Sequence, residues 1–157
     1  GLWDNKENCK NTIIDFAQYA DIVKVTDEEL AFLTDMDNEI DGVRKIFDYA
    51  VNAKILLVTK GKNGACAYDR SLATCESKAV DVKVVDTTGA GDCFAGCVLY
   101  ALTAGEASLD LDGIRAAVDF ASVGCGVVVG KKGAMEAMPT KQDIEQLKKQ
   151  LIEKKVF

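Results

Sequence analysis

The stretch DTTGAGDCF at residues 86–94 places small residues and a carboxylate at the predicted start of a helix. A strand-like alternation precedes it, formed by Val80, Val82 and Val84. A helical apolar pattern follows it, formed by Phe94, Cys97, Val98, Ala101 and Leu102. The helix N-terminus therefore comprises Gly89, Ala90, Gly91 and Asp92. Free backbone N–H groups and partial positive charge there favour an anion such as a phosphate oxygen.

Asp92 indicates which reaction such an anion would undergo. A carboxylate beside a bound phosphate repels it, unless the carboxylate is there to take a proton. In phosphoryl transfer one carboxylate orients the acceptor hydroxyl, and backbone donors stabilise the transferred group. We therefore expect Asp92 to be a general base, worth roughly a hundred- to ten-thousand-fold in rate. The same residues also suit an ordinary helix start, in which Thr87 or Thr88 caps the helix and Asp92 favours its first turn.

Composition indicates one globular domain over residues 1–157. The chain is 48% hydrophobic and 28% charged, an ordinary balance for a protein with a buried core. Its net charge of -6 and its lack of long basic runs argue against nucleic acid or an anionic membrane as partner. The sequence contains no run of roughly 18 apolar residues and no visible signal peptide. We therefore expect a cytoplasmic protein.

Six cysteines are scattered among apolar residues, and the chain contains no histidine. These cysteines are Cys9, Cys66, Cys75, Cys93, Cys97 and Cys125. No C-x-x-C pair occurs, so buried thiols are expected rather than zinc ligands or disulfides. Without histidine, a Ser-His or Cys-His nucleophile is excluded, and proton transfer falls to a carboxylate, lysine or tyrosine.

Hydrophobic periodicity predicts strands and helices in β, α, β order. Helices are expected over about residues 7–19, from Thr26, after Asn38, over residues 90–102, around residues 114–125, and after Pro139 with Thr140 as cap. In the helix after Asn38, the residues expected to face inward are Ile40, Val43, Phe47, Ala50 and Val51. Strands are expected at Ile22–Val25 and Ile55–Val58, followed by short antiparallel strands at Ala65–Tyr68, Leu72–Cys75 and Val80–Val84. This order predicts an α/β fold with a mostly parallel sheet, a short antiparallel section and helices on its faces.

Four segments resemble signatures of the ribokinase-like, or PfkB, family of carbohydrate kinases. DTTGAGDCFAG at residues 86–96 is similar to the family's second signature, and ADIVKVTDEEL at residues 20–30 resembles its N-x-x-E segment. TKGKNG at residues 59–64 resembles its T-x-G-x-x-G turn, and KKGA at residues 131–134 its R-K-G-A segment. Residues 24–33 and KGAMEAMPT at residues 132–140 look most like fructokinases. The resemblance implies an ATP-dependent sugar kinase with a three-layer α/β/α fold.

The same resemblance assigns ATP contacts to the side chain of Thr59 and the backbone of Gly61 and Gly64. These residues follow a predicted buried strand, at the end where open α/β sheets bind ligands. Ser122 stands where the family often has Asn or His near adenine.

Two metal sites are implied by the resemblance. Glu29 takes the place of the glutamate that holds the water shell of a magnesium ion, and Thr26 replaces the usual Asn. Thr26 and Glu29 alone would also form a capping box. The family's monovalent cation site, suited to potassium, corresponds to Asp86 and Thr88 with backbone oxygens around Val128, Lys131, Gly133 and Ala137. Asp86 and Thr88 could instead simply fix the turn.

Members of the family are much longer than this chain, so we expect residues 1–157 to be the C-terminal half of such a kinase and to be inactive alone. Most sugar contacts would then lie elsewhere, and the chain would expose a strand edge and an apolar patch that favour a homo-oligomer. A nucleoside or phosphosugar kinase is the nearest alternative. A nucleotide-binding module that performs no transfer is a second alternative from a different class.

Overall fold

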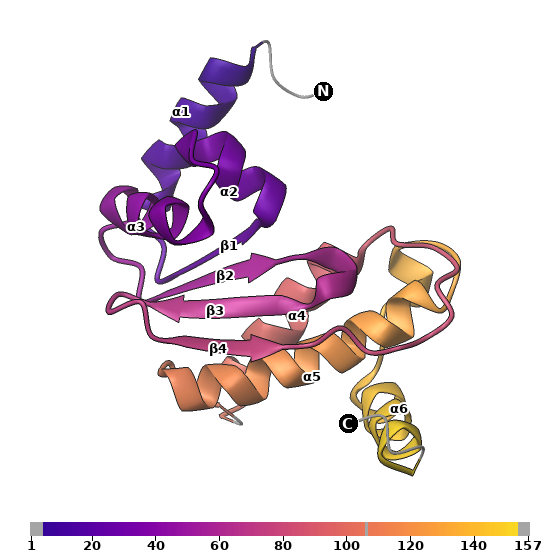
Figure 1. The fold of residues 1–157 in the computed structure, drawn as a ribbon. Helices are drawn as coiled ribbons and strands as arrows, with labels where there is room; N and C mark the ends of the chain where they lie inside the picture. Colours follow the sequence, from indigo (N-terminus) through magenta and orange to yellow (C-terminus); the bar gives the residue numbers. More distant parts are fainter. Residues whose placement is uncertain (1–4, 106, 154–157) are drawn as a thin grey trace.

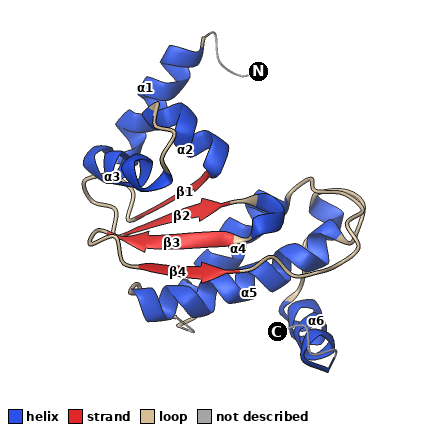
Figure 2. Cartoon of the chain, viewed as in Figure 1, coloured by secondary structure: helices blue, strands red, loops and turns tan. Residues whose placement is uncertain are grey.

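Helices cover both faces of one mixed sheet in the computed structural model of the chain (Figure 2). The structure describes residues 5–105 and 107–153. Within them the strand order is β1-β2-β3-β4, with β1 at Ile22–Thr26, β2 at Ile55–Thr59, β3 at Ala65–Asp69 and β4 at Thr74–Ser77. β1 and β2 pair in parallel, whereas β2, β3 and β4 form an antiparallel meander. The α/β fold is confirmed, and parallel pairing within the described residues is confined to β1 and β2.

One helical layer consists of α1 (Lys6–Ala17), α2 (Asp27–Thr34) and α3 (Glu39–Tyr49). α2 and α3 pack on one face of the sheet through a core that includes Leu33, Val43 and Phe47. The predicted inward positions Ile40 and Val51 are wrong, since their side chains are 37% and 59% exposed. Ile40 lies in the first turn of α3 and Val51 lies beyond its end, so neither reaches the centre of the packed face.

The second helical layer consists of α4 (Ala90–Thr103) and α5 (Leu111–Val129), which run behind the sheet in Figure 1. α6 (Lys141–Glu153) follows α5. The helical spacing after residue 90 is confirmed, because the residues buried on α4 are Cys93, Phe94, Cys97, Val98 and Ala101, with Leu102 packed at the margin of the core. Thr140 begins α6 as predicted, and its hydroxyl accepts the Asp143 N–H at 3.2 Å.

The segment between β4 and α4 is not the strand that the alternation at residues 80–84 predicts. It runs along α5 instead, and the N–H groups of Val85 and Asp86 both donate to the carbonyl of Val129, at 2.7 and 3.2 Å. Gly126 of α5 makes room for it, since a Cβ there would stand 2.2 Å from Val80 Cγ2. The extended backbone therefore binds a helix end rather than a neighbouring strand.

The hairpin between β3 and β4 is longer than predicted. Leu72 was expected in a strand, but its φ of +65° places it in the connection, and β4 begins only at Thr74. Asp69 fixes this connection, because its Oδ1 accepts the N–H groups of Ser71 and Ala73 at 2.8 and 3.0 Å. An aspartate that caps its own turn in this way outweighs the strand preference of a single leucine.

Candidate active site

The segments predicted to form the site meet at one end of the strands, where β1 and β2 have their carboxyl ends (Figure 1). Thr26 and Thr59 close these two strands and lie opposite each other in the parallel register. The loops that follow β2, β4 and α5 gather beside them, through the contacts described below. Ligands of open α/β sheets bind at the carboxyl ends of the strands.

The N-terminus of α4 is open, as its glycine-rich sequence predicts. Gly89 is the N-cap residue, with a φ of +82°, and no side chain caps the helix. The hydroxyl of Thr88 donates to Asp86 instead. The N–H groups of Gly91 and Asp92 find no acceptor within the described part of the chain. The alternative in which a threonine caps this helix is therefore wrong, and the first turn can receive an anion.

Gly89 is required by its backbone conformation and by its neighbours. A Cβ at Gly89 would stand 3.1 Å from Met138 Cε and 3.3 Å from Ala134 Cα. Both neighbours belong to the loop after α5, which contains the short helix η2 (Met135–Ala137). This loop therefore packs directly against the start of α4.

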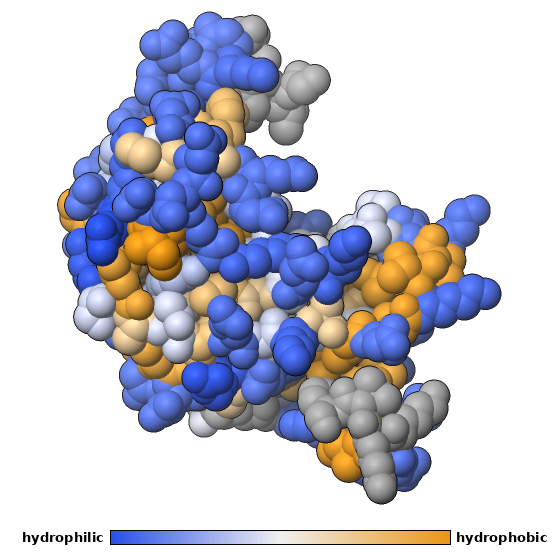
Figure 3. All heavy atoms as spheres, in the orientation of Figure 1, coloured by the Kyte–Doolittle hydropathy of each residue, from blue (hydrophilic) through white to orange (hydrophobic). Residues whose placement is uncertain are grey.

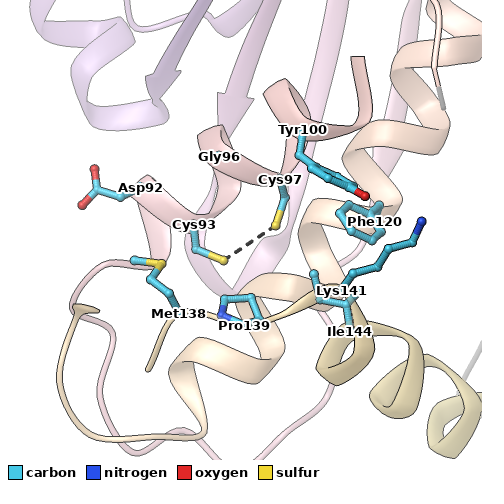
Figure 4. Close-up of a pocket in the computed structure, with 10 residues that line it drawn as sticks. All are labelled: Asp92, Cys93, Gly96, Cys97, Tyr100, Phe120, Met138, Pro139, Lys141 and Ile144. Atoms are coloured by element: carbon cyan, nitrogen blue, oxygen red, sulfur yellow. Dashed lines mark hydrogen bonds between the residues drawn. The ribbon is translucent and has the colours of Figure 1, made fainter. Parts of the chain in front are cut away.

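Asp92 lies in the first turn of α4, and its side chain is exposed. Its carboxylate points away from the thiols of Cys93 and Cys97 (Figure 4). From β1, the Lys24 side chain reaches the same turn, and its Nζ lies 3.5 Å from the point where a Cβ on Gly91 would stand. The structure thus brings a cation that the sequence did not single out to the open N-terminus. Its sequence signal is weak, a lysine between the apolar residues of a short strand.

The turn at residues 59–64 contains a short helix, η1 (Gly61–Asn63), and is closed by the Lys60 N–H, which donates to Gly64 O at 2.7 Å. Gly61 and Gly64 have φ values of +52° and +89°. A Cβ on Gly64 would stand 2.1 Å from the carbonyl oxygen of Ser77, whereas one on Gly61 would meet nothing within 4 Å. Gly64 thus lets the turn approach β4, and Gly61 faces open space.

A half-buried ion pair anchors this turn to α3. Lys60 Nζ lies 2.7 Å from Glu39 Oε1, and the hydroxyl of Tyr68 donates to the same carboxylate oxygen. Burial raises the pKa of Glu39, but the hydrogen bonds from Lys60 and Tyr68 outweigh it and hold that pKa below its usual value. Lys60 is therefore a structural residue of the turn, and Glu39 and Tyr68 are neighbours of the site that sequence reasoning missed.

Ser122 is buried, and its Oγ lies 3.0 Å from Ser77 Oγ on β4. Because Ser77 also contacts Gly64, it links the predicted nucleotide turn to the predicted adenine-side residue. Ser77 was missed by sequence reasoning, although it continues the alternation of exposed and buried residues along β4. The Ser122 hydroxyl is thus engaged inside the protein.

Glu29 forms the predicted capping box with Thr26. Its Oε2 accepts the Thr26 N–H at 2.7 Å, and its own N–H donates to Thr26 Oγ1 at 3.0 Å. The other carboxylate oxygen accepts no hydrogen bond from residues 5–105 or 107–153. Glu29 therefore keeps one free, exposed oxygen at the carboxyl end of β1.

Asp86 ties the segment before α4 to the loop after α5. Its Oδ1 accepts the hydroxyl and the N–H of Thr88, at 2.7 and 2.9 Å, and its Oδ2 accepts the Gly133 N–H at 3.0 Å. The Thr88 hydroxyl first, and then the two backbone N–H groups, lower the pKa of Asp86 to about 2. Asp86 and Thr88 therefore fix this turn.

Of the other residues of the predicted monovalent cation site, Val128 lies in the last turn of α5, and Lys131, Gly133 and Ala137 lie in the loop that follows it. Val128 O accepts the Lys131 N–H at 3.0 Å, and the Ala137 N–H donates to Ala134 O at 3.3 Å. Among the described residues, no three Cys, Asp or Glu side chains cluster so as to hold a metal ion. Any cation in this loop would therefore depend on backbone oxygens.

A cavity of about 240 Å³ opens beside α4, between α4, α5 and α6 (Figure 4). It is lined by Asp92, Cys93, Gly96, Cys97, Tyr100, Phe120, Met138, Pro139, Lys141 and Ile144.

Cys93 Sγ and Cys97 Sγ lie 3.9 Å apart, and contact with the Cys125 thiol raises the pKa of Cys93 to about 12. The six cysteines are free; Cys66, Cys75, Cys93 and Cys97 are buried, whereas Cys9 and Cys125 are partly exposed. No helix in the described residues is long and apolar enough to cross a membrane.

Proteins with similar sequences and structures include fructokinases and a riboside kinase. Probable fructokinase-4 of Arabidopsis thaliana is 36% identical over 152 residues, which cover 94% of this chain and 45% of that protein. A double mutant of Vibrio cholerae O395 fructokinase, solved with fructose, ADP and potassium ion, superposes with a TM-score of 0.84 at 29% identity, over 93% of this chain and 46% of that one. Aminoimidazole riboside kinase of Salmonella enterica, solved with its riboside and an ATP analog, superposes with a TM-score of 0.81 at 28% identity, over 92% and 48%.

The chain thus spans about half the length of the relatives it matches. Its helices and mixed sheet have the ribokinase-like fold of these kinases. A family model described as pfkB family carbohydrate kinase matches residues 2–141. This match covers most of the chain and includes the open turn with Asp92, so the chain belongs to the pfkB family of carbohydrate kinases.

Proposed function

We propose that the chain carries the nucleotide side and the catalytic base of an ATP-dependent sugar kinase whose acceptor is fructose or a related sugar. The observation that carries this proposal is the open N-terminus of α4, with Asp92 in its first turn. The family match supports phosphoryl transfer to a carbohydrate. The fructokinase relatives support fructose as the acceptor. The ATP analog in the riboside kinase structure supports ATP as the donor.

Asp92 would accept the proton of the attacking sugar hydroxyl. The sugar oxygen forms a bond to the terminal phosphorus of ATP while the bond from that phosphorus to the bridging oxygen breaks, which releases ADP. The N–H groups of Gly91 and Asp92 would stabilise the charge on the transferred group. Gly89 and Ala90 have little or no side chain, so the group can approach this turn closely. Because the Asp92 carboxylate is exposed, it would be accessible to a sugar bound outside the helix.

The nucleotide would lie along the turn at residues 59–64 and extend toward α5. The turn offers the backbone of Gly61, which faces open space. It also offers the Thr59 hydroxyl, which donates to Val25 O at 3.4 Å and can still accept a hydrogen bond. Gly64 contributes through the compact shape of the turn. The Ser122 hydroxyl lies 3.0 Å from the Ser77 hydroxyl. We propose that Ser122 supports the adenine side of the site through this contact with Ser77.

Magnesium fits the exposed carboxylate of Glu29, whose free oxygen can accept a hydrogen bond from the ion's water shell. When bound, the ion neutralises charge on the phosphates. Potassium fits the oxygens of Asp86 and Thr88 before α4, together with backbone oxygens around Val128, Lys131, Gly133 and Ala137 at the end of α5 and in the loop after it. The potassium in the Vibrio cholerae structure supports this assignment. The six free thiols favour a reducing compartment, and we propose the cytoplasm.

A coupled assay of ADP release by the complete gene product tests the proposal. The acceptor panel contains fructose, other hexoses, phosphosugars and ribosides, each with magnesium ATP in potassium and in sodium buffer. Fructose-dependent ADP release supports the proposal, and faster release with a riboside or a phosphosugar overturns the acceptor assignment. Nucleotide-induced thermal stabilisation without ADP release for any acceptor would identify a binding module that performs no transfer.

A further inference from the structure

Lys24 is a charged residue on the face of β1 that turns toward α4. Along β1, Val25 packs into the core beneath α2 and α3, whereas Ile22 packs against the core formed with α4 and α5. Since side chains alternate along a strand, Lys24 shares the face of Ile22. Its strand partner Leu57 is buried in that same core. The lysine therefore extends from an apolar surface toward the start of α4.

The amine of Lys24 ends at the positive end of a helix dipole. Its Nζ lies 3.5 Å from the point where a Cβ on Gly91 would stand, beside the free N–H groups of the first turn. Within residues 5–105 and 107–153, Lys24 makes no ion pair, and Asp92 in the same turn does not pair with it. A cation beside a helix N-terminus is unfavourable because both carry positive charge. An anion between them would reverse this, because it would accept from the backbone N–H groups and from the ammonium together.

We propose that Lys24 binds the terminal phosphoryl group of the nucleoside triphosphate, opposite the open turn of α4. This inference rests on the proposed function, since it adds a residue to the same phosphate site. Lys24 would contact the transferred phosphoryl group as a point charge. The N–H groups in the first turn of α4 would orient that phosphoryl group by hydrogen bonding. The diphosphate product has no terminal phosphoryl group at this position. The lysine would therefore distinguish the donor from the product.

A structural role for Lys24 predicts different behaviour. β1 is an edge strand within the described residues, and an inward-pointing charge on an edge strand can deter pairing with another chain. If this were the role of Lys24, its replacement would change self-association and would leave nucleotide affinity unaltered.

Isothermal titration of the complete gene product with ATP, ADP and inorganic tripolyphosphate, each with magnesium, tests the proposal. The variants are Lys24→Met and Lys24→Arg, with Lys54→Met as the matched control. Lys54 is an exposed lysine just before β2, at the opposite end of that strand from the site. We expect Lys24→Met to weaken ATP and tripolyphosphate binding about 10- to 100-fold, the usual loss for a hydrogen bond to a charged group. ADP binding should change less than twofold, Lys24→Arg should retain most of the ATP affinity, and Lys54→Met should match the wild type.

Each other result overturns the inference in a distinguishable way. Unchanged ATP affinity in Lys24→Met shows that the lysine does not contact the triphosphate. Equal losses for ATP and ADP, with a lower melting temperature, show that Lys24 only supports the fold. If the wild-type gene product binds tripolyphosphate through Lys24 but binds neither nucleotide, the anion site stands and the proposed kinase function fails. If it binds none of the three ligands, both fail.

Discussion

Asp86 and Gly133, 47 positions apart in the sequence, are joined by a hydrogen bond of 3.0 Å from the Gly133 N–H to Asp86 Oδ2. With the Thr88 bonds to Oδ1, it makes one carboxylate the link between the segment before α4 and the loop after α5. These bonds favour the ionised form of Asp86, whose pKa falls from 3.8 to about 2.

The stability contributed by Asp86 should therefore depend on pH. A carboxyl group whose pKa is depressed on folding stabilises the protein above its unfolded pKa, and this contribution is lost as the pH falls through the folded pKa. We expect the melting temperature of the wild type to exceed that of Asp86→Asn at pH 5, and the difference to shrink between pH 4 and pH 2. Thermal unfolding followed by circular dichroism measures it, with exposed Asp81→Asn as control. A difference that is constant from pH 2 to pH 5 would contradict the assignment.

Gly64 and Gly61 form a matched pair for substitution. Both have positive φ, but only a Cβ on Gly64 would overlap a backbone atom, Ser77 O, at 2.1 Å. Gly64→Ala should lower the free energy of unfolding by about 3 kcal/mol or more, and Gly61→Ala by about 1 kcal/mol. Urea titration measures both losses. Equal losses would show that conformational strain alone, without steric overlap, explains Gly64.

Ser77 and Ser122 should be energetically coupled. Ser122→Ala leaves the buried Ser77 hydroxyl without its partner, which costs about 1–3 kcal/mol. The double variant Ser77→Ala/Ser122→Ala should cost less than the sum of the two single variants. Urea unfolding of the four proteins gives the coupling energy. Strict additivity of the two single losses would show that the 3.0 Å contact contributes nothing.

Asp92→Asn in the complete gene product should reduce turnover about a hundred- to ten-thousand-fold, because the base that takes the acceptor proton is lost. The affinity for ATP should remain largely intact, since the asparagine keeps the backbone N–H groups of α4. Steady-state kinetics and nucleotide titration separate the two effects. Asp119→Asn, an exposed change on α5, serves as control. Undiminished turnover in Asp92→Asn would remove Asp92 from the role of base.

The chain should self-associate in solution. β1 has one strand neighbour, β2, within the described residues, so its outer edge has unpaired backbone groups. Apolar residues also gather over the loops that follow β4 and α5 (Figure 3), where Val84 and Val85 are 59% and 56% exposed. Light scattering across a dilution series should therefore report a mass above 16.9 kDa that falls on dilution. A monomer at every concentration would contradict this expectation.

Sequence periodicity predicted the helices well because burial of one helix face leaves a direct record. The pattern of Phe94 and Val98 identified α4, and Thr26 with Glu29 identified the start of α2. The alternation at Val80 and Val82 was misleading, because it records that one side of the segment is covered and not what covers it. Here the covering element is α5, which begins only at Leu111, after the whole of α4.

The candidate site was predicted where local backbone requirements reveal it. Gly64 and Gly89 need positive φ, which restricts the residue type at those positions. Lys24 and Ser77 carry no such signal, because a lone lysine or serine in a strand gains meaning only from what packs opposite. For Lys24 this partner is the start of α4, which no spacing within the β1 segment encodes.

The register of the sheet also bears on the order in which the chain acquires its structure. β2, β3 and β4 are successive neighbours, so their hairpins close short loops and can form early. Pairing of β1 with β2 closes a longer loop that contains α2 and α3, and the hydrogen bond between Asp86 and Gly133 closes a still longer one. The end of the sheet that carries the candidate site would then be the last part of the chain to form, and a stalled or newly synthesised chain would contain an ordered meander before it contained that site.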